Sequence, residues 1–162
     1  SQEEAPAARR ASGSVGRMST LRVVVTRDPA DLARCHAVRR EVFVEEQGVT
    51  EREEIDGRDG EATHFLALRG DDVVGTARLR VTNDGVAKAE RVAVRVPERG
   101  RGTGAALMRA LHAEALASGH AEVVLGAQVS AVPFYERLGY AVFGEPFEDA
   151  RIPHRWMRFR LR

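Results

Sequence analysis

The segment from residue 87 to residue 127 constrains the fold more than any other part of the chain, because its pattern changes from strand to helix and back to strand. The run AKAERVAV has the composition of a strand, and AEVVLGA (121–127) has that of a buried strand. Between them runs a helical stripe that ends at Gly119 and is formed by Gly104, Leu107, Met108, Leu111 and Ala115. Two strands joined by one helix in the same sheet run parallel, so the chain needs a sheet covered by helices.

The flanking segments supply further strands and helices. LRVVVT (21–26) predicts a strand, and Asp28 as N-cap with Pro29 at the first helical position predicts a helix after it. Residues 64–69, 73–81 and the strand from residue 87 are separated by GDD and NDG turns, which predicts an antiparallel meander. A short helix over 131–138, a strand near Tyr140 and the final alternating strand HRWMRFRL follow. We predict one α/β (α+β) domain over residues 20–162 and, because residues 1–19 lack hydrophobic periodicity, a disordered N-terminal tail.

Charge and cysteine content exclude several classes of protein. The 162 residues carry a formal net charge of +1, and the arginines are scattered, so no nucleic-acid partner is indicated. Cys35 is the only cysteine, which excludes an internal disulfide and a zinc site built from several thiolates. Its place in a helix beside Leu32 and Val38 predicts a buried apolar residue. We expect a cytoplasmic protein with a small ligand and without a metal or a membrane partner, and a homodimer remains open.

The stretch PERGRGTGAALM (97–108) places three glycines at the start of the predicted helix. A Walker loop needs a lysine that this turn lacks. Gly100, Gly102 and Ala105 satisfy the dinucleotide pattern G-x-G-x-x-A, but the next strand, VVLGAQ, does not end in the required acidic residue. A third interpretation is a diphosphate cradle made of bare backbone amides at a helix N-terminus. A turn that only connects strand and helix remains the alternative.

An ordered set of three motifs resembles the GNAT superfamily of acyl-CoA-dependent N-acetyltransferases. The motifs are ERVAV (90–94), RGRGTG (99–104) and PFYERLGY (133–140), and the resemblance runs from about Leu21 to the C-terminus. The blocks REVFVEEQGV, DGRDGEATHF, LGAQ and RIPHRWM are similar to a small bacterial branch, the ElaA/YjcF-like acetyltransferases. This resemblance implies a GNAT fold. In that fold a mixed central sheet of six to seven strands is flanked by about four helices, and its central parallel strands are splayed to admit acyl-CoA.

The same resemblance implies acetyl-CoA as the co-substrate and assigns residues to it. Backbone of the ERVAV strand would bind the pantetheine arm, and amides of the glycine turn would bind the diphosphate, with Arg99 or Arg101 adding a charged hydrogen bond. Tyr135 would protonate the departing thiolate, although a core aromatic is the alternative for this position. The expected cofactor-binding residues are Val92, Ala93, Val94, Arg99, Gly100, Arg101, Gly102, Thr103, Gly104, Gln128, Phe134 and Tyr135.

The acceptor amine must lose a proton before it can attack, so a base is needed. Glu90 is expected to be catalytic together with Tyr135, whereas Glu46, His64 and His154 are expected to bind the acceptor; each of these four is also a candidate for the base. For the two histidines the alternative is a structural hydrogen bond. Direct transfer in a ternary complex is expected, because Cys35 is predicted to be buried and thus not a nucleophile.

The acceptor itself is expected to be a small-molecule or peptide amine. Between Glu45 and Glu61 the chain holds eight carboxylates against two arginines, which would attract a cationic amine unless this segment is an ordinary solvated loop. The sequence thus predicts an acetyl-CoA-dependent N-acetyltransferase. A non-catalytic sensor of CoA with the same fold is the alternative.

Overall fold

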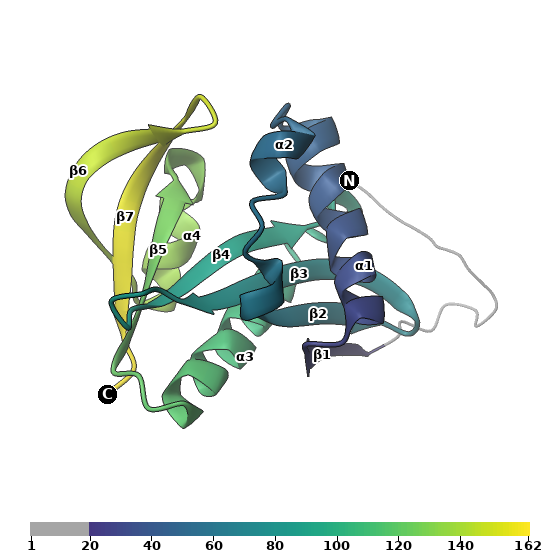
Figure 1. Cartoon of the computed structure of the whole chain (residues 1–162), viewed down its shortest axis with the longest axis horizontal. Helices are drawn as coiled ribbons and strands as arrows, with labels where there is room; N and C mark the ends of the chain where they lie inside the picture. Colours follow the sequence, from purple (N-terminus) through teal and green to yellow (C-terminus); the bar gives the residue numbers. More distant parts are fainter. Residues whose placement is uncertain (1–19) are drawn as a thin grey trace.

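The computed structural model describes residues 20–162, and the tail expected over residues 1–19 lies outside the described residues. Its centre is a mixed seven-stranded sheet in the order β1-β2-β3-β4-β5-β7-β6 (Figure 1). The strands are β1 (Leu21–Thr26), β2 (Thr63–Arg69), β3 (Asp72–Val81), β4 (Ala87–Val94), β5 (Glu122–Gln128), β6 (Ala141–Asp149) and β7 (Ile152–Arg160). All neighbours pair antiparallel except β4 and β5, which are parallel, so the strand-helix-strand prediction is confirmed.

Within residues 20–162, four α-helices flank the sheet, as Figure 1 shows: α1 (Pro29–Arg39), α2 (Glu51–Glu54), α3 (Thr103–Ala117) and α4 (Val132–Leu138). The side chain of Asp28 caps α1 by accepting a hydrogen bond from the amide of Ala30 at 2.9 Å. A π-helical segment, Arg40–Glu46, continues α1 toward the centre of the sheet. The short helix α2 lies in the acidic segment 45–61, for which the sequence predicted no separate helix; its Thr50 N-cap and Glu53 form a capping box that stabilises this single turn.

Helices cover both faces of the sheet, and β2 shows this most clearly. Phe65 and Ala67 belong to the main core, which includes Leu107, Met108 and Leu111 of α3. On the other face, Leu66 and Leu68 pack in a cluster around Cys35 of α1. Because alternate residues of a strand point to opposite faces and both faces are covered, β2 is buried along nearly its whole length. The predicted burial of Cys35 is confirmed, with none of its surface exposed.

The parallel pairing of β4 with β5 lasts for only three residues. Ala87, Lys88 and Ala89 face Val123, Val124 and Leu125, and no pairing follows. Immediately beyond this point β4 is irregular, because Arg78 of β3 faces Glu90 and Thr76 faces Ala93, which leaves two β4 residues opposite one β3 residue. Arg91 in this bulge has φ 55°, an uncommon value for a residue with a side chain. The bulge turns the end of β4 away from β5.

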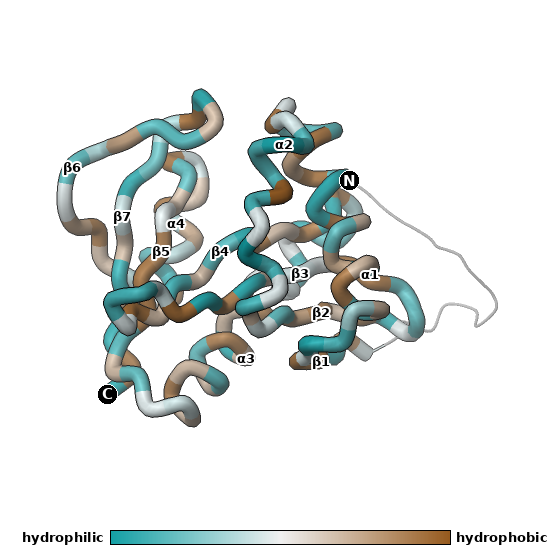
Figure 2. The backbone as a smooth tube through the Cα atoms, viewed as in Figure 1, coloured by the Kyte–Doolittle hydropathy of each residue, from teal (hydrophilic) through white to brown (hydrophobic). Residues whose placement is uncertain are grey.

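Buried arginines hold the segment from α2 to β2 against the sheet. Arg39 is completely buried and donates to Glu54 at 2.9 Å and to Asp59 at 2.7 Å. Arg78 of β3 is 1% exposed and donates to Asp56, Asp59 and Glu90 at 2.8 to 2.9 Å. Figure 2 shows that this segment is mostly hydrophilic although it lies against the sheet. We call the six residues Arg39, Glu54, Asp56, Asp59, Arg78 and Glu90 the arginine network. Each charge in it is paired with an opposite charge, because a buried charge without a partner is very unfavourable.

The network lowers the pKa of its carboxyl groups. Burial alone would raise the pKa of Asp56, but the hydrogen bonds from Arg78 outweigh it and bring this pKa to about 2. For Glu90, burial is likewise outweighed by Arg80, Arg78 and Lys88, which lower its pKa to about 2. The pKa of Asp59 is also lowered, by Arg39, His36 and Arg78 acting against burial. These groups are therefore ionised at neutral pH.

Replacing Arg39 with Met should destabilise the fold by about 3–5 kcal/mol, because it leaves buried carboxylates without their main cation. The neighbouring change Arg40→Met is the matched control: Arg40 is 53% exposed and pairs with the exposed Glu51, so it should cost less than about 1 kcal/mol. Urea unfolding at neutral pH measures both. Equal losses in the two variants would show that burial of the network does not matter for stability.

The lowered carboxyl pKa values predict a loss of stability in acid. An unfolded Asp or Glu takes up its proton near pH 4, whereas the folded groups resist protonation down to about pH 2, so acid favours the unfolded chain in this window. The urea midpoint should be flat above about pH 5 and fall steadily below about pH 4. In Arg39→Met the fall should be shallower. A urea midpoint that rises in acid would contradict the lowered pKa values of these carboxyl groups.

Candidate functional site

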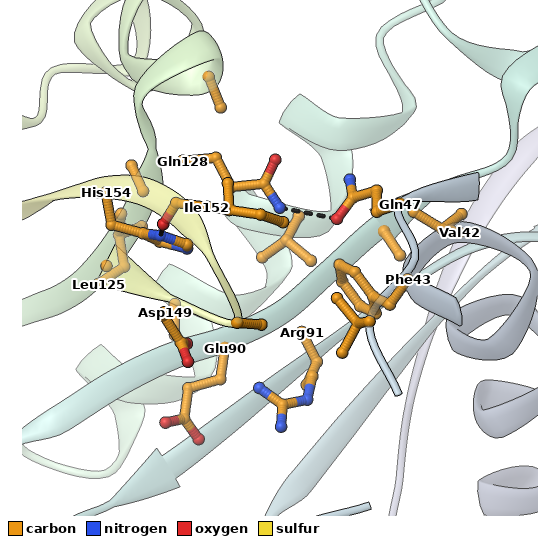
Figure 3. Close-up of a pocket in the computed structure, with 18 of the residues that line it drawn as sticks. Val42, Phe43, Gln47, Glu90, Arg91, Leu125, Gln128, Asp149, Ile152 and His154 are labelled. Carbon is orange, nitrogen blue, oxygen red and sulfur yellow. Dashed lines mark hydrogen bonds between the residues drawn. The ribbon is translucent and has the colours of Figure 1, made fainter. Parts of the chain in front are cut away.

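A cavity of about 480 Å³ opens where β4 and β5 separate. Its lining comes from five parts of the chain that are far apart in sequence. These are the π-helical segment with Val42 and Phe43, α2 with Glu53 and Glu54, β4 from Lys88 to Val94, β5 from Leu125 to Gln128, and the β6–β7 hairpin with Phe147, Asp149, Ile152, His154 and Trp156. Gln47, Arg99 and Tyr135 also line the cavity. Figure 3 shows side chains from these parts converging on one space.

One wall of the cavity is the free edge of β4. After Ala89 the strand has no partner on its β5 side, and Val92, Ala93 and Val94 all line the cavity. Such an edge carries backbone N–H and C=O groups that can pair with an extended ligand. The three residues expected to bind the pantetheine arm by their backbone thus lie in the cavity wall.

The glycine turn lies beside the cavity, whose lining reaches Arg99 but none of residues 100–104. Gly100 and Gly102 have φ of 78° and 86°, and a Cβ atom added at either would meet nothing within 4 Å. The first backbone hydrogen bond of α3 runs from the amide of Ala106 to the carbonyl of Gly102. The amides of residues 103–105 therefore have no partner inside the helix and form an open, positively polarised cradle.

Both arginines of the turn contact carboxylates of the protein. Arg99 donates to both oxygens of Glu46 at 2.6 and 2.7 Å and to the carbonyl of Val94 at 2.8 Å. Arg101 donates to the buried Glu98 at 3.2 Å. The hydrogen bonds from Arg99 lower the pKa of Glu46, so this carboxylate stays ionised and bound. Glu46 does not line the cavity.

Thr103 and Phe134, two further residues expected to bind the cofactor, lie behind the turn. Thr103 is buried and donates to Glu98 at 3.1 Å. The ring of Phe134 lies so close to Gly104 that a Cβ there would be 3.1 Å from it. Their positions indicate that both residues support the start of α3. The closeness of the Phe134 ring explains why residue 104 has no side chain.

Tyr135 in α4 is 7% exposed and lines the cavity. Its ring packs edge-on against Phe134 and Tyr140, with centroids 4.9 and 5.5 Å away. Burial raises the pKa of Tyr135 above its ordinary value. The hydroxyl accordingly keeps its proton at neutral pH, and it has no hydrogen-bond partner within residues 20–162. Tyr140, in contrast, is in the core and hydrogen bonds His112 at 2.6 Å.

Glu90 lines the cavity, but its carboxylate is occupied. It accepts hydrogen bonds from Arg78 at 2.8 Å and Arg80 at 2.9 Å, and Lys88 lies 3.2 Å away. In Figure 3 its side chain extends away from Gln128 and Gln47. With a pKa lowered to about 2, this carboxylate is a weak base.

The two histidines expected to bind the acceptor have different surroundings. His64 in β2 is buried outside the cavity lining, and its Nε2 lies 2.9 Å from the carbonyl of Asp59. His154 in β7 lines the cavity, stacks on Phe147 and has its Nδ1 2.7 Å from the carbonyl of Ile152. The structure therefore brings His154, Glu90, Tyr135 and Gln128 into one site and leaves His64 and Glu46 outside it.

Several cavity residues were not found by sequence reasoning. Gln47 accepts a hydrogen bond from Gln128 at 2.8 Å, and this contact connects the two halves of the cavity (Figure 3). Trp156 stacks on Phe147 with ring centroids 4.4 Å apart, and the ammonium of Lys88 lies 5.2 Å from the tryptophan ring. Gln47 and Trp156 belong to the REVFVEEQGV and RIPHRWM blocks, so those blocks held a usable signal, whereas Gln128 of the LGAQ block was among the residues expected to bind the cofactor. Nothing in the sequence distinguished Phe147 from a core aromatic.

The acidic segment does not present unpaired negative charge to the cavity. Each of its eight carboxylates lies within 4 Å of an arginine: Glu45 and Glu51 with Arg40, Glu46 with Arg99, Glu53 with Arg151, Glu54 and Asp59 with Arg39, Asp56 with Arg78, and Glu61 with Arg58. The expectation of a cationic acceptor therefore gains no support from this segment.

Within residues 20–162 no helix is both long and apolar enough to span a membrane. In the same part of the chain, no three His, Cys, Asp or Glu side chains are grouped so that they could hold a metal ion.

Comparison with known proteins identifies the fold and the family. Residues 29–161 match the family model of the acetyltransferase (GNAT) domain. YjcF of Bacillus subtilis (strain 168), described as an uncharacterized N-acetyltransferase, is 40% identical over 135 residues, which are 83% of this chain and 96% of YjcF. The crystal structure of Escherichia coli ElaA has a TM-score of 0.76 at 28% identity and covers 86% of this chain and 99% of ElaA.

An acyl-CoA N-acyltransferase from Pseudomonas aeruginosa has a TM-score of 0.75 at 27% identity, with 86% of this chain and 99% of that chain covered. The described residues share the fold of these neighbours, which in residues 20–162 of this chain is a mixed seven-stranded sheet with four α-helices. The sequence matches and the structural matches agree along nearly the whole described chain. This chain belongs to the GNAT family of acetyltransferases, and its relatives include YjcF and ElaA.

Proposed function

We propose that the protein transfers an acetyl group from acetyl-CoA to a primary amine by direct attack in a ternary complex. The observation that carries the proposal is the position of Tyr135 in the same cavity as the free edge of β4. The free edge of β4 suits a thioester carried on an extended arm, and the phenol of Tyr135 suits a leaving thiolate. Acetyl-CoA supplies the activated acetyl group.

The residues present fit such a co-substrate. Backbone groups of Val92 to Val94 would hold the amide-rich arm, as an added strand would be held. The open space at Gly100 and Gly102 and the free amides at the start of α3 would receive the diphosphate. An amide aimed at the thioester carbonyl would stabilise the negative charge that develops there, and one such donor is worth about 3 kcal/mol in the transition state.

Tyr135 supports the release of the thiol. The phenol is protonated at neutral pH, and its place in the cavity would let it donate this proton to the departing sulfur, although burial raises its pKa and makes it a weaker acid. None of the lining residues carries a thiol that could compete with the amine as a nucleophile. Cys35, the only cysteine, is buried in α1 against β2. Burial also raises the pKa of this thiol. These features favour direct transfer over an acetyl-enzyme.

Two measurements test the proposal. Calorimetry with CoA and acetyl-CoA should show binding, and acetyl-CoA with a panel of primary alkylamines, lysine peptides and aminoglycosides should release thiol in an acceptor-dependent way. Binding without acceptor-dependent thiol would favour the CoA sensor. Absence of CoA binding would refute both functions.

Placing a negative charge at residue 102 should weaken CoA binding by electrostatic repulsion from the diphosphate. Gly102→Asp and Gly102→Asn form a matched pair, since both side chains tolerate the left-handed backbone found there and differ mainly in charge. The Asp variant should bind CoA at least about tenfold more weakly than the Asn variant, a difference of about 1.4 kcal/mol. Calorimetry at two salt concentrations measures this. Equal affinities would place the diphosphate elsewhere.

Tyr135→Phe should lower kcat by about 10²–10⁴-fold, because the leaving thiolate loses its acid, while the affinity for CoA changes little. Tyr140→Phe is the control: it removes the hydrogen bond to His112 in the core and should lower the melting temperature without changing kcat. Steady-state kinetics, calorimetry and thermal unfolding of both variants separate the two roles. A parallel loss of kcat and CoA affinity in Tyr135→Phe would assign this residue to binding.

A further inference from the structure

We propose that His154 is the general base that takes the proton from the acceptor's ammonium group. The inference rests on the proposed function, since it assigns the proton acceptor of that reaction. It depends on the position of one ring in the cavity and on one hydrogen bond that determines which ring nitrogen carries hydrogen.

His154 is held in a defined orientation at the cavity. It faces Gln128 of β5 on one side and Phe147 of β6 on the other in the sheet register. Its ring stacks on Phe147 at a centroid distance of 5.3 Å and an angle of 28°. The residue is 8% exposed, and it lines the cavity from β7 (Figure 3). A ring held this way has little freedom to turn.

The contact to Ile152 fixes the tautomer. The Nδ1 atom of His154 lies 2.7 Å from the carbonyl oxygen of Ile152. A carbonyl oxygen can only accept, so Nδ1 must carry the hydrogen, and in the neutral ring Nε2 then carries a lone pair. Nε2 has no hydrogen-bond partner within residues 20–162, and it is not among the fully enclosed polar atoms there. The ring therefore presents a free basic nitrogen to the cavity.

The carboxylates around the cavity are poorer candidates. Glu90 is bound to two arginines and has a pKa lowered to about 2. Glu53 and Glu54 of α2 pair with Arg151 and Arg39. Asp149 of β6 is exposed and has no arginine, lysine or histidine within 4 Å in the described chain, so it is the one lining carboxylate that needs a separate test.

Three cations also line the cavity in the described chain, and one of them, Arg99, pairs with Glu46 at the glycine turn. Lys88 and Arg91 of β4 line the cavity opposite the β6–β7 hairpin. Each is paired, Lys88 with Glu90 at 3.2 Å and Arg91 with Glu54 at 2.8 Å. The paired groups on β4 and α2 therefore nearly cancel around His154, and Asp149 is the unbalanced charge.

The proton balance of the transfer closes with His154 and Tyr135 in these roles. Nε2 of His154 takes one proton from the ammonium, which frees the nitrogen lone pair, and later passes this proton to solvent. The amine nitrogen bonds to the acetyl carbon, the carbon–sulfur bond breaks with its electron pair on sulfur, and sulfur receives the phenol proton of Tyr135. The new amide loses its extra proton to the phenolate through water. The net result is an amide, a thiol and one released proton.

The tautomer can be measured without any acceptor. Nitrogen-15 NMR of the full chain at about pH 8 should show, for the histidine signal that disappears in His154→Gln, hydrogen on Nδ1 and a lone pair on Nε2. Hydrogen on Nε2, or a ring that remains doubly protonated at this pH, would overturn the proposal. This result does not depend on whether the protein turns over acetyl-CoA, so the inference and the proposed function can fail separately.

Kinetics supply the second test, with whichever amine of the panel is turned over. His154→Gln should lower kcat/KM for the amine by about 10²–10⁴-fold near neutral pH. Activity should recover as the pH rises, because more of the amine is already unprotonated. CoA affinity by calorimetry should not change. His120→Gln, the same substitution just beyond α3 and outside the cavity lining, should leave kcat/KM and its pH profile unchanged.

Two kinetic results would overturn the assignment. One is a His154→Gln variant whose pH profile has the wild-type shape, because the proton acceptor would then still be present. The other is an Asp149→Asn variant that shows the loss and the recovery at high pH expected for His154→Gln, which would assign the base to that carboxylate.

Discussion

The parallel contact between β4 and β5 covers three residue pairs, and the rest of the site depends on where it ends. A parallel pair of ordinary length would bury the edge of β4 in hydrogen bonds to β5. Here the bulge at Arg91 turns β4 away, and the backbone from residue 90 onward borders a cavity instead. The sheet stays one body because β3 still pairs with β4, and β7 pairs with β5. The cavity is therefore a gap inside a continuous sheet.

The arginine network determines the charge state of the carboxylates beside β4 in this gap. It fixes α2 and the following segment to the sheet through Arg39 and Arg78, and it also binds Glu90. A carboxylate held by two arginines contributes to the structure but takes up protons poorly. The arginines that hold Glu90 in place therefore also make it a poor base. The proposed base on the opposite side, His154, is held by a neutral carbonyl and an aromatic ring, which leaves Nε2 free.

Much of the fold could be predicted from local sequence. The Asp28 cap, the turn glycines and the alternation in the last strand each act within a few residues, and the elements formed where these signals indicated. The short helix α2 was not predicted from the acidic segment; a capping box between Thr50 and Glu53 stabilises its one turn. For the site, the motifs located the β4 edge and Tyr135 in the cavity wall. They also suggested His64, which the fold buries elsewhere.

The sequence by itself determined the strand-helix-strand unit, the bare amides of the glycine turn and the phenol that follows β5, because each depends on conformations and spacings within one stretch of chain. Only the tertiary structure decided which charges remain free. Arg99 and Glu46 are 53 residues apart in sequence and form a bidentate pair, and eight carboxylates that looked like an acidic surface all have arginine partners. Ion pairing and ring orientation depend on distances of a few ångströms between distant segments, and the order of residues along a chain does not specify those distances.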